Sequence, residues 1–418
     1  MGRILLQIKH GVSVVNREAL ISSAADRYDR VALVDWLLSE GRRAADIPAL
    51  IDALCRRLVD EGLPLWRCVL GLRLLHPQIL FMSHTWRRGQ GHVETHHRAH
   101  GAENTPEYLT SPFAAVIDQG ADALRFRLDR MEPPWPYPVL EDLHQQGGTD
   151  YAMMALPFST GRRNTLSFAS DRPGGFSTDD LAVIDGILPA LAAVVEMMTV
   201  RRLAGTVLDT YVGRRTGARI LSGDIRRGTG ANVRAVLWDC DLRGFTRLAD
   251  QLGREELIAL LNGYFEIMAG AVEAHDGEVL KFIGDAMLAI FPLPDACEAG
   301  CDTEACRRAL DAAEEALAGI ARRNAERAAW GDPVLRCGIA LHIGDVMYGN
   351  IGAPNRLDFT VIGPSVNLVS RLEGLCKRLD RDVLTSAAFA EACGDRLVSL
   401  GWHPVKGMPE PVEVYGLR

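Results

Sequence analysis

The stretch that decides the fold of the C-terminal half reads GEVLKFIGDAMLAIF and runs from Gly277 to Phe291. Two apolar runs flank the pair Gly284-Asp285, which is typical of a tight turn, so the pattern predicts a β-hairpin. Lys281 and Asp285 interrupt the apolar residues, and burying an unpaired charge is costly. An internal ion pair or an exposed turn would explain both charges. The alternative is that both meet a ligand from outside the chain.

The composition of the 418-residue chain is that of an ordinary globular protein, with 48% hydrophobic and 24% charged residues. The net charge of −8 gives no electrostatic footprint for a nucleic acid or an anionic membrane, so neither is expected as a partner. We expect no membrane span, and the N-terminus lacks the uninterrupted apolar stretch of a signal peptide. Nine scattered cysteines suit a reducing compartment, so a cytoplasmic protein is expected.

Alternating helical and strand-like segments predict an α/β (α+β) fold in which helices pack on sheets. A helix is expected at 47–58, and strands are expected at 68–75, 79–85, 150–158, 163–170, 334–344, 345–352 and 357–363. Another helix should follow Ser177, a suitable N-cap. Its apolar residues, at steps of three and four, fit a short coiled-coil seam and a domain-packing helix equally well: Ile184, Ile187, Leu191, Val194 and Met198. The predicted parts are a leader at 1–25, an N-terminal domain at 26–198, a helical connector at 199–230 and a C-terminal domain at 231–418.

Two carboxylates are expected at neighbouring strand ends of the C-terminal domain. Asp241 closes an apolar strand, and Asp285 lies in the hairpin turn. Together with the carbonyl of Leu242 they suit Mg²⁺ or Mn²⁺ bound with substrate phosphates, although aspartates at turns are also common for conformational reasons. Asn367 and Arg371 stand four apart and share one helix face. Such a pair suits a sugar-phosphate group or, without further context, an ordinary solvated face.

Four segments resemble, in order and spacing, the motifs of the class III nucleotidyl cyclases. They are VLWDCDLRGFTRLAD (236–250), LKFIGDAMLAIF (280–291), DFTVIGPSVNLVSRLE (358–373) and VKGMPEPVEVYGL (405–417). The resemblance covers about residues 205–418. It implies a ferredoxin-like, polymerase-palm-like domain that works as a head-to-tail homodimer. It also implies conversion of a nucleoside triphosphate to a 3′,5′-cyclic nucleotide and pyrophosphate, with two Mg²⁺ or Mn²⁺ ions per site.

The resemblance implies a role for each matching residue: metal binding for Asp241 and Asp285, base recognition for Lys281 and Thr360, ribose orientation for Asn367, transition-state stabilisation for Arg371 and terminal-phosphate binding for Lys406. Glu and Cys typically take the two base-reading positions in the guanylyl branch, so the resemblance favours ATP. The alternatives are GTP or a pyrimidine nucleotide, and a non-catalytic nucleotide-binding module. Trp238, Asp239 and Cys240 depart from the family's usual small or aromatic run, and Asp239 shares the strand face of Asp241.

Residues 150–198 resemble the C-terminal half of a GAF domain, notably in ALPFSTGRRNTLSFAS (155–170) and RPGGFSTDDLAVIDGILPAL (172–191). This implies a GAF-like sensory or dimerising domain that passes an unknown small-molecule or protein signal to the cyclase. Two clusters of metal-ligating residue types are expected in loops rather than in metal or haem sites. They are His92, His96, His97 and His100 within 89–107, and Cys297, Cys301 and Cys306 in an insertion.

Overall fold

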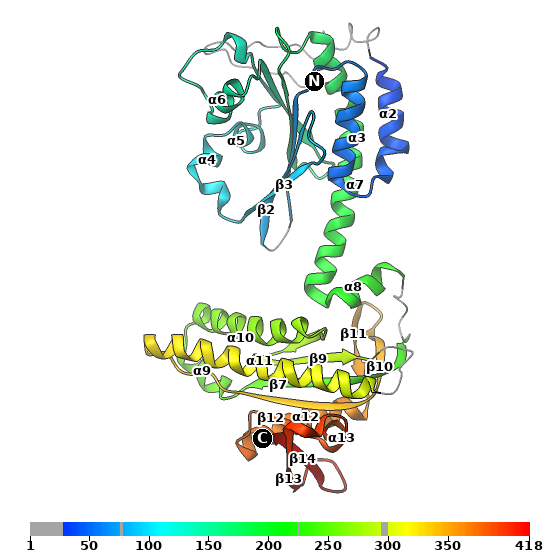
Figure 1. Ribbon diagram of the computed structural model, residues 1–418, viewed down its shortest axis with the longest axis vertical. Helices are drawn as coiled ribbons and strands as arrows, with labels where there is room; N and C mark the ends of the chain where they lie inside the picture. The colour runs from blue at the N-terminus through cyan, green and yellow to red at the C-terminus, as the bar shows by residue number, and fades with distance from the viewer. Residues whose placement is uncertain (1–27, 76–77, 224–225, 227, 229, 294–299) are drawn as a thin grey trace. The chain divides into compact units, whose positions relative to one another are not determined.

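The computed structural model describes residues 28–75, 78–223, 226, 228, 230–293 and 300–418. The predicted leader at 1–25 lies outside this range. The chain divides into two compact units, Met1–Val207 and Leu208–Arg418, and each is built on its own sheet (Figure 1). The mixed α/β character expected from the sequence is confirmed, with helices packed on both sheets.

The first unit contains a six-stranded antiparallel sheet in the order β3-β2-β1-β6-β5-β4. Its strands are β1 (Arg67–Arg73), β2 (Ile79–Arg87), β3 (Glu94–Ala99), β4 (Ala123–Phe126), β5 (Asp150–Pro157) and β6 (Arg163–Ser170). The loop expected at 89–107 is wrong, because this segment includes β3, which pairs with β2. His96 and His97 are exposed on this edge strand. The polar composition therefore marks a solvent-facing sheet edge.

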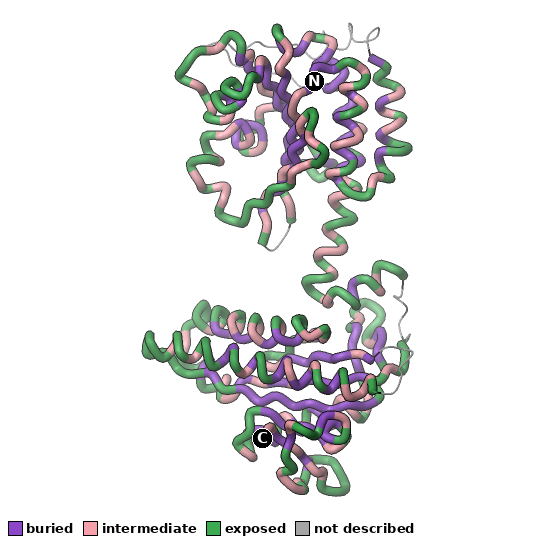
Figure 2. The backbone as a smooth tube through the Cα atoms, viewed as in Figure 1, coloured by how far each residue is buried: buried purple, intermediate pink, exposed green. Residues whose placement is uncertain are grey.

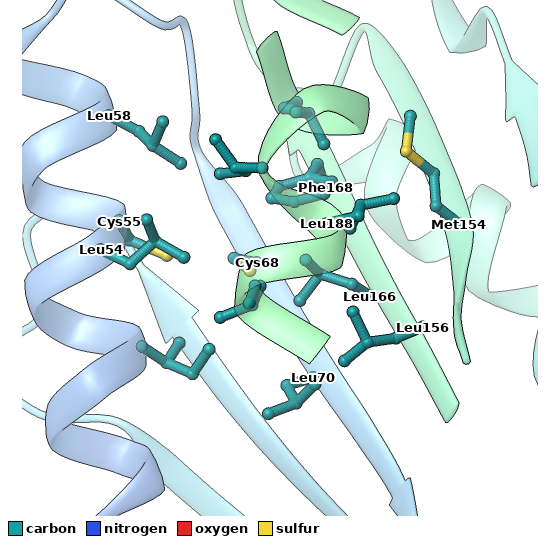
Figure 3. Close-up of a cluster of buried hydrophobic side chains, with 14 of the residues drawn as sticks. Leu54, Cys55, Leu58, Cys68, Leu70, Met154, Leu156, Leu166, Phe168 and Leu188 are labelled. Atoms are coloured by element: carbon teal, nitrogen blue, oxygen red, sulfur yellow. The ribbon is translucent and has the colours of Figure 1, made fainter. Parts of the chain in front are cut away.

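Helices cover both faces of this sheet. One face carries α2 (Arg30–Ser39), α3 (Ile47–Asp60) and α7 (Thr178–Val212), and the other carries α5 (Pro112–Ile117) and α6 (Pro138–Gln145). Shorter elements complete the unit: α4 (Pro106–Leu109), η1 (Gly41–Arg43), η2 (Ala102–Asn104) and η3 (Leu128–Arg130). The predicted helix at 47–58 is confirmed as α3. It starts where the Asp46 carboxylate accepts a 2.8 Å hydrogen bond from the Ala49 amide. Its apolar stripe, including Leu54 and Leu58, packs toward Phe168 of β6 and Leu188 of α7 (Figure 3).

Helix α7 extends well beyond the predicted boundary of its domain. Its N-terminus is capped by Ser177, whose Oγ accepts a 3.1 Å hydrogen bond from the Asp180 amide. The seam residues Ile187 and Leu191 are fully buried in the core of the first unit, which supports the domain-packing interpretation within this chain. The helix continues to Val212, so it takes up part of the segment expected as a connector, and α8 (Arg214–Leu221) follows.

Two described helices, α7 and α10 (Arg254–Ala274), are long and apolar enough to cross a membrane. The expectation of no membrane span therefore stays a prediction, because length and composition alone do not distinguish a span from a core helix. Both helices bury apolar side chains against a sheet of their own unit, as Leu191 and Tyr264 illustrate. Packing in a protein core accounts for the apolar character of α7, whose apolar window is 56% buried, and for part of that of α10, whose window is 28% buried.

The second unit contains an eight-stranded sheet in the order β13-β14-β12-β10-β7-β9-β8, with β11 paired to β10. Its strands are β7 (Gly230–Leu242), β8 (Glu278–Ile283), β9 (Ala286–Pro292), β10 (Cys337–Ala353), β11 (Arg356–Ile362), β12 (Val383–Ser386), β13 (Leu397–His403) and β14 (Val412–Leu417). The predicted hairpin is confirmed as β8 and β9, joined at Gly284-Asp285. The two strands expected at 334–344 and 345–352 are one strand, because β10 pairs with β7 without a register break.

The helices of the second unit lie on opposite faces of this sheet. α9 (Phe245–Gln251), α10, α11 (Cys301–Trp330) and α13 (Ala387–Cys393) share one core with the sheet, and α12 (Pro364–Leu379) packs on the other face. A short η4 (Gly394–Arg396) follows α13. Figure 2 shows the buried residues concentrated along the central strands. Cys306 is fully buried in α11, so the expected surface loop is wrong for this thiol, while Cys297 lies outside the described residues.

Candidate active site

Strand β7 carries the first metal-binding candidate to the edge of the core. Its alternation sends Trp238 and Cys240 into the core shared with α10 and α11, so Asp239 and Asp241 face the side of α12. Asp241 is register partner of both Gly338 in β10 and Ala286 in β9. Its Oδ1 atom is buried without a hydrogen-bond partner among the described residues. A buried carboxylate oxygen without a donor is expensive, so this position is suited to an external cation.

The hairpin turn brings Asp285 to Asp241. Gly284, with a φ of +66°, allows the tight turn, and Asp285 follows it in the turn, directly before β9. Burial and, next, the adjacent Asp241 carboxylate raise the pKa of Asp285 to about 7. Two carboxylates this close repel when both are ionised, and a divalent cation would relieve that repulsion.

Two residues of α12 lie beside the aspartates of β7, and the sequence analysis did not identify them. Burial raises the pKa of Asp239 to about 6, and a hydrogen bond from Ser370 opposes that rise. Burial, followed by the charges of Asp241 and Asp239, raises the pKa of Glu373 to about 7. Helix α12 therefore directs Ser370 and Glu373, three residues apart, toward the aspartates. A signal was present in the sequence, because Glu373 lies on the stripe of α12 that otherwise carries buried apolar residues.

The expected phosphate-binding residues lie at a turn next to α12. Gly407, with a φ of +76°, lies against the Arg371 guanidinium, whose Nη2 would be 3.1 Å from a Cβ at position 407. Arg371 is thereby brought beside Lys406, the residue before Gly407. Among the described residues, neither side chain has a hydrogen bond or ion pair, and both keep their donors available. Asn367 is exposed one turn earlier on α12.

The two base-reading candidates lie on strands that contact each other, β8 and β11. Phe282 packs against Phe265 of α10 with the ring centroids 4.4 Å apart and the rings tilted by 47°, so alternation sends Lys281 to the opposite face of β8. Thr360 is 5% exposed, and its Oγ1 is buried without a partner among the described residues. A buried hydroxyl without a partner is available to a ligand.

The structure therefore brings together two groups of the predicted residues: Asp241 with Asp285, and Arg371 with Lys406. In the described part of the chain, no hydrogen bond or ion pair links Lys281, Thr360, Asn367, Arg371 or Lys406 to the aspartate pair. Leu242 ends β7 with its side chain buried in the core, and its backbone follows directly after Asp241.

The donor set fits a divalent cation that also binds the substrate. Asp241 and Asp285 supply hard oxygen atoms, and one of these is buried without a donor. Across the described residues, no group of three or more His, Cys, Asp or Glu side chains is arranged to hold a metal ion by itself. Mg²⁺ commonly binds through one or two carboxylates plus substrate phosphates, which is compatible with both observations.

Residues 234–417 match the family described as the adenylate and guanylate cyclase catalytic domain. The second unit thus carries a cyclase catalytic domain. The chain is 36% identical to adenylate cyclase 1 of Rhizobium meliloti over 177 residues, which are 42% of this chain and 26% of that protein. It is 30% identical to an adenylate cyclase of Anabaena cylindrica over 204 residues, 47% of this chain and 39% of that protein. The chain thus spans well under half the length of these relatives.

Solved structures similar to the chain include cyclases named for each of the two nucleotides. A bacterial light-regulated adenylyl cyclase is 27% identical, with a TM-score of 0.45 over 55% of this chain and 62% of that one. The guanylyl cyclase Cya2 is 29% identical, with a TM-score of 0.39 over 45% of this chain and 93% of that one. These names include both adenylyl and guanylyl specificity.

Proposed function

We propose that the protein is an adenylyl cyclase that converts ATP to 3′,5′-cyclic AMP and pyrophosphate. The observation that carries the proposal is the Asp241–Asp285 pair, which lies at adjoining strand ends inside a cyclase catalytic domain. The pair keeps a buried oxygen without a donor. We expect it to hold two divalent cations, Mg²⁺ or Mn²⁺, with the Leu242 carbonyl as a further ligand.

When bound, the cations would lower the pKa of the ribose 3′-hydroxyl and neutralise the leaving pyrophosphate. The chain's own residues would do the rest. Arg371 would donate to the charge that develops on the α-phosphoryl oxygens, a contribution of typically about 3 kcal/mol for a preorganised donor. Lys406, beside it, would hold the terminal phosphates, and Asn367 would orient the ribose. The available donors of Arg371 and Lys406 support these roles.

Lys281 and Thr360 are proposed to read the base. The buried, unpartnered Thr360 hydroxyl supports this role, because a polar atom kept away from water needs a ligand to pair with. A lysine donor and a hydroxyl suit the adenine edge better than the Glu and Cys found in the guanylyl branch. GTP or a pyrimidine nucleotide remains the alternative substrate. The proposal of a non-catalytic module is disfavoured, because all seven matched positions carry side chains of the family type.

A homodimer is proposed to complete the site. Two observations support it. The described contacts do not link the phosphate-binding residues to the aspartate pair. The hairpin also exposes large apolar side chains, with Phe282 52% and Ile283 57% exposed. Exposed apolar residues around a functional site are typical of a surface that a second chain covers.

Regulation by the N-terminal unit is proposed to begin at a cavity of about 500 Å³ between its sheet and α4 and α5. Phe81 and Tyr108 stack there with centroids 5.0 Å apart, and Ser83, His96 and Arg98 supply polar groups. A volume of this size with aromatic walls suits a small molecule, the kind of signal expected for a GAF-like domain. We further propose that the protein works in the cytoplasm.

The deciding experiment is turnover of the four nucleoside triphosphates by the full chain, with Mg²⁺ and with Mn²⁺, and with the product identified by mass. Cyclic AMP from ATP is the expected product. Asp241→Asn and Asp285→Asn should each abolish turnover, whereas Asp395→Asn, an exposed position on η4, should leave it unchanged. Absence of any cyclic product in the wild type would reject cyclase activity, and near wild-type turnover in either site variant would reject the metal assignment.

A further inference from the structure

Glu373 lies next to the proposed metal site although no described side chain pairs with it. Its residue type is unexpected at this position, because Val369, Leu372 and Cys376 on the same side of α12 are buried in the core. Strand β10 has a glycine where the Glu373 carboxylate lies. A Cβ added to Gly338 would come within 2.6 Å of Glu373 Oε1. Gly338 is also the register partner of Asp241, so the carboxylate lies over the strand pair that carries this aspartate.

The charges around Glu373 are mostly of its own sign. Asp241, Asp239 and Asp285 all raise its pKa, after the larger effect of burial, and Arg243 alone lowers it. The Arg243 guanidinium is engaged elsewhere. It donates to the Cys376 carbonyl at 3.3 Å and lies 3.4 Å from the Asp382 carboxylate. Within the described residues, Glu373 itself has no hydrogen bond or ion pair.

A half-buried carboxylate beside three others is unfavourable unless a positive charge arrives. Among the described residues, Arg243 is the cation near these carboxylates, and its guanidinium contacts the Cys376 carbonyl and the Asp382 carboxylate instead. Glu373 is also not arranged as a third ligand, since no three acidic side chains of the described residues could hold an ion by themselves. A carboxylate that lies outside the ligand set can still favour a bound cation through its charge and through bound water. Such a role explains both the need for a positive charge and the lack of a three-ligand arrangement in the described part of the chain.

We propose that Glu373 is a positioning residue that raises the affinity of the Asp241–Asp285 pair for divalent cations without binding the cation directly. This inference rests on the proposed function, because it assumes that the pair is the metal site. Outer groups of this kind typically change metal affinity about 10- to 100-fold. Gly338 is then the residue that leaves room for this carboxylate.

The test is a titration of the full chain with Mn²⁺ alone, without nucleotide, in which free Mn²⁺ is measured by electron paramagnetic resonance. Glu373→Gln, which keeps the size and removes the charge, should weaken Mn²⁺ binding about tenfold. Glu373→Asp, which keeps the charge and draws it back by one methylene, should give a smaller loss. Glu391→Gln, an exposed position on α13, is the matched control and should bind as the wild type does.

Thermal unfolding separates a charge effect from a packing effect. Without metal at pH 8, Glu373→Gln should unfold at a higher temperature than the wild type, because a repelling charge is removed, and Mn²⁺ should stabilise it less. Wild-type Mn²⁺ affinity in Glu373→Gln, together with loss of binding in Asp241→Asn, would overturn the role of Glu373 alone. Wild-type affinity in Asp241→Asn would instead overturn the metal site of the proposed function.

Discussion

Replacing Thr216 by valine tests how the connector is fixed to the catalytic sheet of the second unit. Thr216 of α8 is 1% exposed, and Glu278 at the start of β8 is 6% exposed. Oε1 of Glu278 accepts hydrogen bonds from the Thr216 amide at 3.3 Å, from the Thr216 hydroxyl at 3.1 Å and from the Tyr348 hydroxyl at 3.1 Å. Oε2 is buried with no partner in the described part of the chain. The Thr216 amide and the hydroxyls of Thr216 and Tyr348 are therefore the donors that compensate for the burial of the Glu278 carboxyl group.

Valine keeps the shape of threonine and removes only its hydroxyl donor. Loss of a hydrogen bond to a charged group costs about 1.5–3 kcal/mol, and burial leaves little solvent screening to reduce that figure. For a unit of this size, each kcal/mol lowers the melting temperature by roughly 2–4 °C. We therefore expect a fall of about 3–12 °C in the transition of the second unit by differential scanning calorimetry. Thr210→Val, an exposed position on α7, is the matched control and should change the transition little.

A double-mutant cycle makes the test sharper. Tyr348→Phe removes the second hydroxyl donor to Glu278. The Thr216 Oγ1 and Tyr348 hydroxyl oxygens also lie 3.1 Å apart, so the losses of stability in the two single variants should not add in the double variant. This hydrogen-bonded group lies next to the strands that carry the base-reading candidates. Glu278 is three residues before Lys281, and Tyr348 packs edge-to-face on Phe359, the neighbour of Thr360. A Thr216→Val transition within 1 °C of the wild type, or fully additive effects, would refute a shared buried network.

Three further predictions concern the base, the dimer and acid stability. Lys281→Glu combined with Thr360→Cys should lower kcat/KM for ATP and admit GTP, because donors facing the purine are exchanged for acceptors; an unchanged preference would show that these residues do not read the base. Asp285→Ala and Arg371→Ala should each be inactive, yet mixing them should restore up to about a quarter of wild-type turnover, since half of the dimers would keep one of two sites; no activity after verified subunit exchange would place both residues in one chain's site. Burial lowers the pKa of His342 to about 4, so the unfolded chain binds more protons between pH 4 and about 6.5. Folded stability should therefore fall by roughly 3 kcal/mol as the pH drops through that window, and His342→Gln should flatten the profile in urea unfolding; an equally steep profile in the variant would assign the acid sensitivity to other groups.

The sequence predicted the β8–β9 hairpin and the position of Asp285 because both depend on local chemistry. Gly284 supplies the turn, and apolar runs on either side supply the strands. Strand β3 could not be predicted in this way, because its polar residues are held by pairing with β2 rather than by burial. The single long β10 was missed for a related reason. Gly344 and Asp345 look like a break in the sequence, but pairing with β7 carries the strand through them.

The site shows the same division between local and tertiary information. Asn367 and Arg371 could be predicted from their spacing, because helix geometry alone gives them a common face. The sequence marks Glu373 only as a charged residue on the apolar stripe of α12. Its place beside the aspartates could not be predicted, since it depends on Gly338, a residue 35 positions away in the sequence that leaves space only when α12 packs on β10. One helix thus presents substrate-binding candidates on one face and a carboxylate beside the aspartates on another. If Glu373 acts as proposed, any shift of α12 on the sheet would change metal affinity and substrate positioning together, which would couple the two within a single rigid element.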